Sequence, residues 1–282
     1  MNLSQLLAHF KTELKDVYED EEVKSIFSVA VEHLLKITRS SLMMNWDKEL
    51  SLAVQEQFYA VAAGLKTHKP IQYLLGEAYF YGSFFIVNEA VLIPRPETEE
   101  LVDWILEDHL AGKTVIDFGT GSGCIAISLK KHVEALDVTA VDLSQEALSV
   151  ASENALRLGS PVNFIHADIL SFKSEARFDI IVSNPPYITG KEMAEMHQNV
   201  LAHEPHLALF VPDERPLLFY EAVADFAVSN LKKNGKLFFE INEYLSEETI
   251  QMLKDKGFEF ISLRKDMQGK PRMILASKVV RS

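Results

Sequence analysis

The chain has 282 residues with 41 acidic and 28 basic side chains, which gives a formal net charge of −13. This length predicts about two domains with a sizeable core, and no apolar stretch approaches the ~20 residues that a membrane helix needs. Enzymes that bind duplex nucleic acid usually present a basic face to its phosphates. An acidic chain whose basic runs are no longer than pairs such as Lys232-Lys233 therefore predicts no direct nucleic-acid binding and no membrane insertion.

The cytoplasm is the expected location of the protein. Its single cysteine, Cys124, excludes an internal disulfide framework and fits a reducing compartment. The N-terminus lacks a basic region followed by an apolar core, so it predicts no signal peptide. The nine histidines show no metal-ligand spacing, and we expect no metal site. We interpret Cys124 as a small core residue rather than a reactive thiol.

The first part of the chain predicts a helical domain. Residues 3–68 are interpreted as helices, because apolar residues recur with helical spacing in the runs 3–14, 23–37 and 52–65. We assign residues 1–75 to an N-terminal helical domain and interpret it as a platform that recognises a protein substrate.

A hairpin and an α/β domain follow the helices. Residues 76–93 alternate in hydrophobicity around Gly82, which predicts a β-hairpin linker. From residue 94 to residue 282 helices and strands alternate as in a doubly wound sheet. We assign this region as the catalytic domain, with one of its later strands at residues 236–241.

A glycine-rich loop follows the first strand of this domain. The β-branched strand that begins at Thr114 runs into Asp117, and the loop continues as Gly119-Thr120-Gly121-Ser122-Gly123 before an apolar helix. Glycines let the backbone approach a ligand closely, and a helix start offers free N–H groups. The spacing is G-x-G-x-G, and it lacks the later small residue of the dinucleotide fingerprint, so pyrophosphate binding is disfavoured.

Two acids follow the next two predicted strands. Asp142 ends the strand 137–141, about twenty residues past the loop, where nucleotide-binding α/β folds place an acceptor for ribose hydroxyls. Its alternative role is the N-cap of a helix that begins at Gln145. Asp168 follows the strand 162–166 and is suited to accept a hydrogen bond from an exocyclic amine such as that of adenine, with a cap or a turn as its alternative role.

The tetrapeptide Asn184-Pro185-Pro186-Tyr187 follows an apolar run, 178–183, that ends like a buried parallel strand. Two prolines fix two φ angles and remove two backbone donors, so the Asn184 side-chain oxygen and the Pro185 carbonyl can face outward as acceptors. Two acceptors suit a substrate –NH2 group, and Tyr187 adds a flat face for a planar group. The alternative is a simple Pro-Pro turn. The motif nevertheless shares its place at a strand end with the three preceding motifs, where open α/β sheets bind ligands.

These motifs resemble those of the class I S-adenosylmethionine-dependent methyltransferases with an N-P-P-Y active site. Further segments are similar to the protein-glutamine methyltransferases that act on peptide chain release factors: 73–77, 79–82, 92–99, Glu204-Pro205 with Ala208-Leu209, and Asp266-x-x-Gly269-x-x-Arg272. The resemblance extends from about Pro70 to the C-terminus. It implies a Rossmann-like α/β fold, a seven-stranded sheet that ends in an antiparallel hairpin, here at 258–263 and 272–276.

The resemblance also implies a cofactor and a division of roles. S-adenosyl-L-methionine is the expected methyl donor, with S-adenosyl-L-homocysteine as its product. The expected cofactor-binding residues are Asp117, Gly119, Thr120, Gly121, Ser122, Gly123, Asp142, Asp168, Ile169 and Asn184. The expected catalytic residues are Asn184, Pro185 and Tyr187, and the expected substrate-binding residues are these three with Pro186, Arg95 and Glu97. Arg95 and Glu97 also suit the start of a helix, because Pro96 favours a first helical position.

The implied reaction methylates the glutamine side-chain amide in the Gly-Gly-Gln motif of class 1 release factors, and we expect a monomer. The alternatives are a glutamine methyltransferase of a ribosomal protein, a nucleic-acid adenine methyltransferase, which the acidic charge disfavours, and a cofactor-binding protein without catalysis. The chain departs from the family at residues 210–212, Asn242 and Leu245, where the family usually carries two glycines, a glycine and a glutamine. We expect these positions to lie away from the Asn-Pro-Pro-Tyr motif.

Overall fold

A computed structural model describes residues 1–37, 41 and 46–278 of the chain. The chain divides into two compact units, one formed by residues 1–77 with 197–203 and the other by residues 78–196 with the chain from residue 204 onward. The segment 197–203 lies within the predicted catalytic domain, yet by its contacts it belongs to the first unit. In the described ranges no helix is long and apolar enough to cross a membrane.

The first unit is helical. Three phenylalanines, Phe10, Phe27 and Phe58, are buried together in its core with ring centroids 5.1 to 6.1 Å apart, the spacing at which aromatic pairs attract. They come from three different helices, so the apolar faces predicted from sequence do pack on one another. Part of the predicted helical range, at 38–40 and 42–45, lies outside the described residues. The helices are α1 (Leu3–Leu14), α2 (Asp20–Leu35), α4 (Leu52–Leu65), α5 (Ile71–Leu75) and α9 (Gln198–His203).

A hairpin forms where the first unit gives way to the second. Its strands, β1 (Glu77–Phe80) and β2 (Ser83–Ile86), are joined by Tyr81 and Gly82, whose φ angles are 45° and 74°. Two consecutive positive φ angles are what a tight two-residue hairpin turn requires. The side chains alternate between the faces, with Ala78, Phe80 and Phe85 buried and Tyr79 and Phe84 exposed.

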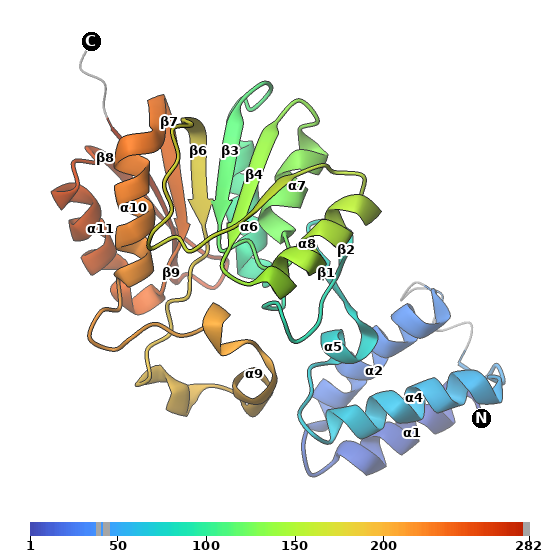
Figure 1. Cartoon of the computed structure of the whole chain (residues 1–282). Helices are drawn as coiled ribbons and strands as arrows, with labels where there is room; N and C mark the ends of the chain where they lie inside the picture. The colour runs from blue at the N-terminus through green and yellow to red at the C-terminus, as the bar shows by residue number, and fades with distance from the viewer. Residues whose placement is uncertain (38–40, 42–45, 279–282) are drawn as a thin grey trace. The chain divides into compact units, whose positions relative to one another are not determined.

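A seven-stranded sheet forms the centre of the second unit (Figure 1), in the order β5-β4-β3-β6-β7-β9-β8. Strands β3 to β7 pair in parallel, whereas β9 runs antiparallel to both β7 and β8. This topology confirms the predicted fold class, including its final antiparallel pair. The strands are β3 (Thr114–Phe118), β4 (Asp137–Asp142), β5 (Asn163–His166), β6 (Phe178–Ser183), β7 (Leu231–Glu240), β8 (Phe260–Lys265) and β9 (Pro271–Ser277).

The strand predicted at 236–241 is longer than expected, because β7 begins at Leu231. Leu231 pairs with Phe178 and Lys236 with Ile180, so the register shifts between these two pairs. Asn234, at a φ of 64°, lies within the irregular stretch. The Asn234-Gly235 dipeptide, a pair typical of tight turns, is therefore accommodated as a bulge-like irregularity within the strand.

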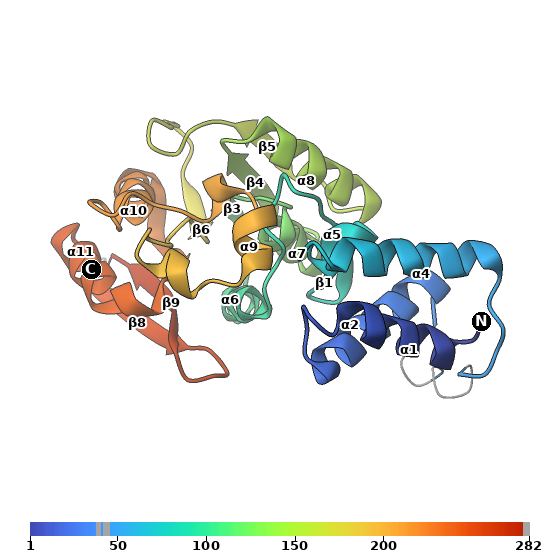
Figure 2. The same ribbon diagram turned by 90° about the horizontal axis from the view of Figure 1, so that it is seen from below.

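Helices cover both faces of the sheet. On one face Val115, Ile180 and Phe238 pack under α6, α7 and α8, and on the other their neighbours Ile116 and Ile181 pack under α10 and α11. Figures 1 and 2 show α6 and α10 on opposite sides of the sheet. Burial on both faces explains why these strands have continuous apolar runs rather than an alternating pattern. The helices are α6 (Pro96–Leu106), α7 (Cys124–His132), α8 (Gln145–Arg157), α10 (Leu218–Asn230) and α11 (Ser246–Asp255), with short turns η1 (Glu192–Glu195), η2 (His206–Ala208) and η3 (Glu243–Leu245).

The sheet brings the predicted motifs to one edge. The chain order reverses at β3, which has β4 on one side and β6 on the other, and ligands bind beyond the carboxyl ends of strands at such a switch point. The Ser183 hydroxyl donates to the Phe118 carbonyl at 2.8 Å, which ties the ends of β6 and β3 together. The glycine loop and Asn184 therefore begin side by side.

Candidate active site

A cavity of about 290 Å³ lies beyond the carboxyl ends of β3 to β6. Apolar side chains such as Val91, Leu143 and Val223 form much of its wall, and a few polar groups face it, as in most small-molecule sites. The predicted site residues that line it are Gly119, Gly121, Asp142, Asp168, Ile169, Asn184, Pro185 and Pro186. Those that do not are Asp117, Thr120, Ser122, Gly123, Tyr187, Arg95 and Glu97.

The glycine loop borders the cavity with bare backbone. Gly121 has a φ of 55°, and a Cβ added there would meet no protein atom within 4 Å, so a side chain would occupy open space that a ligand can use. Gly123, at a φ of 81°, has a different role. A Cβ there would lie 2.6 Å from Ile127 and 3.2 Å from Ala151, so this glycine permits the close packing of α7 and α8.

Asp142 is held by the backbone on two sides. Its Oδ2 accepts from the N–H of Gly121 at 2.8 Å, and its Oδ1 accepts from the N–H of Ser144 at 2.9 Å. Burial raises the pKa of this carboxyl, and these two N–H groups oppose the rise. The alternative role of Asp142 as a helix N-cap is wrong, because Ser144 caps α8 by accepting from the N–H of Ala147. Asp142 lines the cavity, and a carboxylate oxygen can accept more than one hydrogen bond, so this side chain can also accept from a ligand.

Asp168 faces the cavity from the loop after β5. Its Oδ1 accepts from the N–H of Leu170 at 2.9 Å, and its carbonyl accepts from the N–H of Ser171. The turn that was its alternative role is therefore present, and it orients the carboxylate. Asp168 and the following Ile169 both line the cavity, so a polar edge and an apolar surface lie next to each other there.

Asp117 lies beneath the loop as a fully buried acid. Its Oδ2 accepts from the Thr120 hydroxyl at 2.7 Å, whereas its Oδ1 makes no hydrogen bond within the described residues. Burial raises the pKa of Asp117 to about 7 and the Asp142 carboxylate adds to the rise, although the Thr120 hydroxyl and the Ala126 N–H lower it. A buried acid with one unpaired oxygen beneath a glycine loop fits a ligand that carries positive charge, because a nearby cation favours the ionised form.

The Asn-Pro-Pro-Tyr segment sits against two polar side chains that sequence reasoning missed. Asn184 Nδ2 donates to the hydroxyl of Thr98 at 3.4 Å, and that hydroxyl donates to Glu240 Oε2 at 2.7 Å. The Tyr187 hydroxyl lies 3.5 Å from the other Glu240 oxygen. In the described part of the chain the Asn184 Oδ1 and the Pro185 carbonyl accept no hydrogen bond, so both of the acceptors predicted from sequence are available.

Glu240 is the most buried acid on this side of the site, with 2% of its surface exposed. Burial raises its pKa to about 7, and the Glu97 carboxylate adds to the rise, against the lowering by the Thr98 hydroxyl, the Arg272 guanidinium and the Tyr187 hydroxyl. Burial, with the charge on Glu240, also raises the pKa of Tyr187. The phenol therefore stays protonated and acts only as a donor toward Glu240.

The departures from the family pattern do not all lie away from this segment, and that expectation is wrong for two of them. Asn242 Nδ2 donates to the Tyr187 carbonyl at 3.1 Å and to Glu192 at 2.9 Å. Phe210 forms an isolated bridge with Ile188, the residue after Tyr187. The sequence could not show these contacts, because each joins residues far apart in the chain.

Arg95 and Glu97 begin a helix, as their alternative role predicted. Arg95 is the N-cap residue of α6, Pro96 follows it, and Glu97 lies in the first turn. Arg95 also pairs with Glu204 at 2.5 Å, and that carboxylate accepts from the N–H of Ile93 as well. The pair links the helix start to the loop beyond the Asn-Pro-Pro-Tyr segment.

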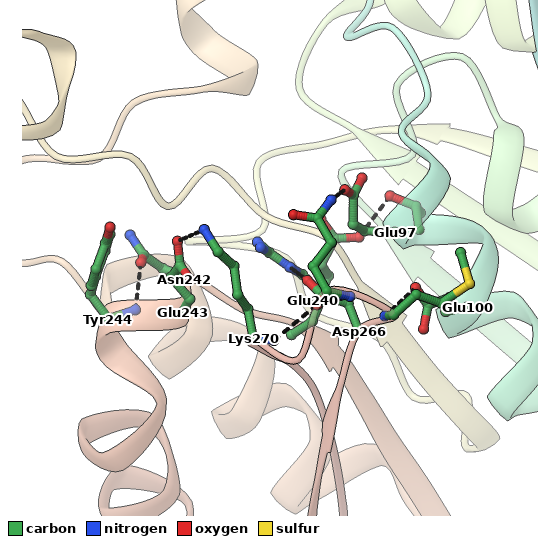
Figure 3. A network of polar contacts seen from close by, with 12 residues as sticks. Glu97, Glu100, Glu240, Asn242, Glu243, Tyr244, Asp266 and Lys270 are labelled. Carbon is green, nitrogen blue, oxygen red and sulfur yellow. Dashed lines mark hydrogen bonds and ion pairs between the residues drawn. The ribbon is translucent and has the colours of Figure 1, made fainter. Parts of the chain in front are cut away.

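The turn between β8 and β9 makes polar contacts with α6 and with η3 (Figure 3). Gln268 Nε2 lies 3.4 Å from Glu97 Oε1, and Lys270 pairs with Glu243 at 2.9 Å. Asp266 accepts from Arg272 Nε at 3.0 Å, which fixes the guanidinium beside Glu240. The Asp-x-x-Gly-x-x-Arg motif is therefore a rigid turn that positions one cation.

Asn154 is a third residue that sequence reasoning did not identify. It is fully buried on α8, where its Oδ1 accepts from the N–H of Ile86 at 2.6 Å and its Nδ2 donates to the carbonyls of Ile86 and Ser122 at 3.0 Å. One amide thus joins the hairpin to the glycine loop. A polar residue on the inner face of an amphipathic helix was the only signal for it.

Cys124 is a partly buried residue packed against the core, as interpreted from sequence. Burial raises the pKa of its thiol to about 12, with the Asp117 charge adding to the rise, so the reactive thiolate is not populated near neutral pH. No cluster of three metal-ligating side chains occurs in the part of the chain that the structure covers.

Two protein-family models match the chain, one in the first unit and one mostly in the second. The family model "Methyltransferase small domain" matches residues 97–208, and the model "PrmC N-terminal domain" matches residues 5–76. Two solved structures show the same fold at low identity. A T. thermophilus 16S rRNA N2 G1207 methyltransferase, in complex with AdoMet and guanosine, is 20% identical and covers 72% of this chain and 50% of its own, with a TM-score of 0.53. The hMettl16 catalytic domain, in complex with an RNA hairpin, is 12% identical and covers 82% and 84%, with a TM-score of 0.55.

Relatives of known name match nearly the whole chain. The release factor glutamine methyltransferase of Flavobacterium psychrophilum is 43% identical over 279 residues, which is 95% of this chain and 98% of the relative. That of Bacteroides thetaiotaomicron is 40% identical over 278 residues, or 98% and 100%. Identity at this level over both units, together with the acceptor pair at the end of β6, means that the chain belongs to the release factor glutamine methyltransferase family.

Proposed function

We propose that this protein transfers a methyl group from S-adenosyl-L-methionine to the side-chain amide nitrogen of the glutamine in the Gly-Gly-Gln motif of class 1 release factors. The observation that carries the proposal is the pair of available acceptors, Asn184 Oδ1 and the Pro185 carbonyl, beside the cavity. An amide –NH2 has two hydrogens to place, and two acceptors match it. The relatives that share this chain's full length bear the name of the same activity.

The glycine-loop side of the cavity suits the cofactor. Bare backbone at Gly119 and Gly121 admits a close approach, Asp142 offers acceptors for ribose hydroxyls, and Asp168 offers one for the adenine amine. The buried Asp117 favours a ligand with positive charge. When bound, the cofactor supplies a methyl group that its sulfonium has already activated.

The protein's own contribution is alignment. An amide nitrogen is a poor nucleophile, because its lone pair is delocalised into the carbonyl. Asn184 Oδ1 and the Pro185 carbonyl each accept a hydrogen bond from the substrate –NH2 group. These two bonds orient the nitrogen toward the methyl group and stabilise the positive charge that develops on the nitrogen. The Tyr187 hydroxyl donates to Glu240, and the Tyr187 ring gives the substrate amide a flat surface to pack on. The proposed mechanism assigns no general base, and the proton leaves to solvent after transfer.

The setting of the reaction is part of the proposal. We infer that the helical unit recognises the folded release factor, that the enzyme acts as a monomer in the cytoplasm, and that it binds no nucleic acid directly. The net charge of −13 supports the last inference, because an acidic surface repels phosphates.

Mass spectrometry of purified class 1 release factors, incubated with this protein and labelled cofactor, tests the proposal. We expect one added methyl group on the glutamine of the Gly-Gly-Gln motif. A release factor with that glutamine changed to alanine is the matched control and should gain no label. Label on a ribosomal protein or on an adenine of nucleic acid, with none on the release factors, would refute the proposed substrate.

A further inference from the structure

The Asn184 side chain serves as an acceptor only when its oxygen, and not its nitrogen, faces the cavity. The two ends of an amide have nearly the same shape, so packing alone does not choose between them. In the structure the nitrogen faces Thr98, with 3.4 Å between Nδ2 and Oγ1. The residue that selects this orientation therefore acts on the reaction without touching the substrate.

Thr98 has the chemistry to make that selection. It is buried on the first turn of α6, and its hydroxyl has one hydrogen to donate. Glu240 Oε2 lies 2.7 Å from the hydroxyl, and an ionised carboxylate only accepts, so the hydrogen points to Glu240. The hydroxyl then presents only lone pairs to Asn184. These lone pairs attract Nδ2 and repel Oδ1.

We propose that Thr98 and Glu240 are positioning residues that set the Asn184 amide with its oxygen toward the substrate. The inference rests on the proposed function of Asn184. At 3.4 Å the hydrogen bond is weak, but the selection also includes the repulsion that the reversed amide would meet. The two hydrogen bonds, from Asn184 to Thr98 and from Thr98 to Glu240, run in the same direction. They do so because an ionised Glu240 can only accept.

Protonation of Glu240 removes that direction. A neutral carboxyl can donate to Thr98, whose own hydrogen is then free to bond Oδ1 of a reversed Asn184. The groups that face Glu240 are the Thr98 and Tyr187 hydroxyls, the Glu97 carboxylate on α6 and the Arg272 guanidinium on β9. The buried Tyr220 phenol and the Cys124 thiol also lie within electrostatic range of it. Because the pKa of Glu240 is about 7, the direction of these hydrogen bonds is sensitive to pH near neutrality.

Three variants test the hydroxyl. Thr98→Val keeps the shape and removes the hydroxyl, and we expect the single-turnover rate at saturating cofactor and release factor to fall about three- to tenfold, the size of one hydrogen bond. Thr98→Ser restores the hydroxyl and should restore most of the rate. Thr249→Val is the matched control, because Thr249 is also a buried helical threonine, with a hydroxyl bonded to the Leu245 carbonyl at 2.7 Å. It should lower stability but not the rate.

A second arm separates orientation from general structural damage. A carboxylate presents an acceptor whichever way it turns, so in an Asn184→Asp background the Thr98→Val change should cost much less. The wild-type rate should also decline as the pH falls below about 7, because Glu240 then takes up a proton, and the decline should be smaller in Thr98→Val. Equal rates for the Val and Ser variants, or an equal Thr98→Val loss in both backgrounds, would overturn the proposal.

An NMR measurement reads the orientation without any substrate. In isotope-labelled protein at alkaline pH, the side-chain amide protons of Asn184 should show cross-relaxation with the Thr98 side chain, and this signal should weaken at acidic pH. Amide protons that show no proximity to Thr98 at alkaline pH would overturn the inference. Failure of the wild-type enzyme to methylate release factors would instead refute the proposed function, and the NMR result would still decide the orientation.

Discussion

The two halves of the candidate site hold their polar groups in different ways. On the β3–β5 half, backbone N–H groups hold the carboxylates of Asp142 and Asp168. On the β6–β7 half, side chains hold one another, from Asn184 through Thr98 to Glu240. Backbone donors remain whatever the neighbouring side chains are, whereas a chain of side chains fails when one member changes. We therefore expect the first half to tolerate substitution nearby and the second half to be sensitive to it.

The two halves also differ in what opposes the effect of burial on the pKa of their acids. Asp142 receives two backbone hydrogen bonds that oppose the effect of burial on its pKa. Within the described residues Glu240 accepts from the Thr98 and Tyr187 hydroxyls and lies near the charge of Arg272, and burial raises its pKa to about 7. Protonation of Glu240 near neutral pH therefore changes the polar contacts that hold Asn184, whereas Asp117, whose pKa is also about 7, lies beneath the glycine loop and holds neither Asp142 nor Asp168.

The largest expected effect is on Asn184. Asn184→Ala should lower the rate of methyl transfer by roughly a hundredfold or more, as the loss of one preorganised polar contact does elsewhere. Cofactor affinity, measured by calorimetry, should change much less than the rate, because the other expected cofactor-binding residues, on the β3–β5 half, are intact. Asn184→Asp is the control and should retain part of the activity, since a carboxylate still accepts. Near-normal turnover by the alanine variant would mean that the segment is only a turn.

A smaller effect is expected on the other half. Asp142→Ala should weaken cofactor binding by roughly 1–3 kcal/mol, because ribose acceptors are lost. Asp142→Asn keeps one acceptor oxygen and should lose less. Calorimetric titration with S-adenosyl-L-methionine and its demethylated product should show a similar loss for both ligands. Unchanged affinity in Asp142→Ala would remove this carboxylate from the proposed site.

The smallest expected effect is on stability as a function of pH. The pKa of Glu240 is about 7 in the folded chain against a reference value of 4.5. Between these values the folded state keeps a proton that the unfolded state has lost, so the free energy of unfolding falls as the pH rises. Between pH 6 and pH 8, Glu240 contributes about 1 kcal/mol to this fall in the free energy of unfolding.

Urea unfolding at these two pH values measures that contribution. Glu240→Gln should remove it and reduce the slope, while Asp117, whose pKa is also about 7, continues to contribute a slope of the same sign. Asp142→Asn should reduce the slope less, if backbone N–H groups do hold that acid as described. A larger change for Asp142→Asn than for Glu240→Gln would reverse the comparison between the two halves.

The sequence predicts the β3–β5 half better than the β6–β7 half for a physical reason. Asp142 and Asp168 each follow an apolar strand directly, and a strand end is visible in a local pattern. The Asn184–Thr98 and Thr98–Glu240 contacts join residues 86 and 142 positions apart, so no local pattern reports them. Thr98 in particular looks like an ordinary residue of a helical first turn. The extension of β7 to Leu231 was missed because an Asn-Gly pair usually ends a strand, whereas here the register shift accommodates it.

The hydrogen bond between Ser183 and Phe118 also has a consequence for how the molecule folds. These residues are 65 positions apart, and they end the parallel neighbours β6 and β3. Pairing of such distant segments pays a large loop-closure entropy and is typically slow. The two loops that carry the candidate site face each other only after that step. A partly folded chain therefore has no complete cavity, and a ligand that binds there stabilises the finished sheet by mass action without helping its earlier stages.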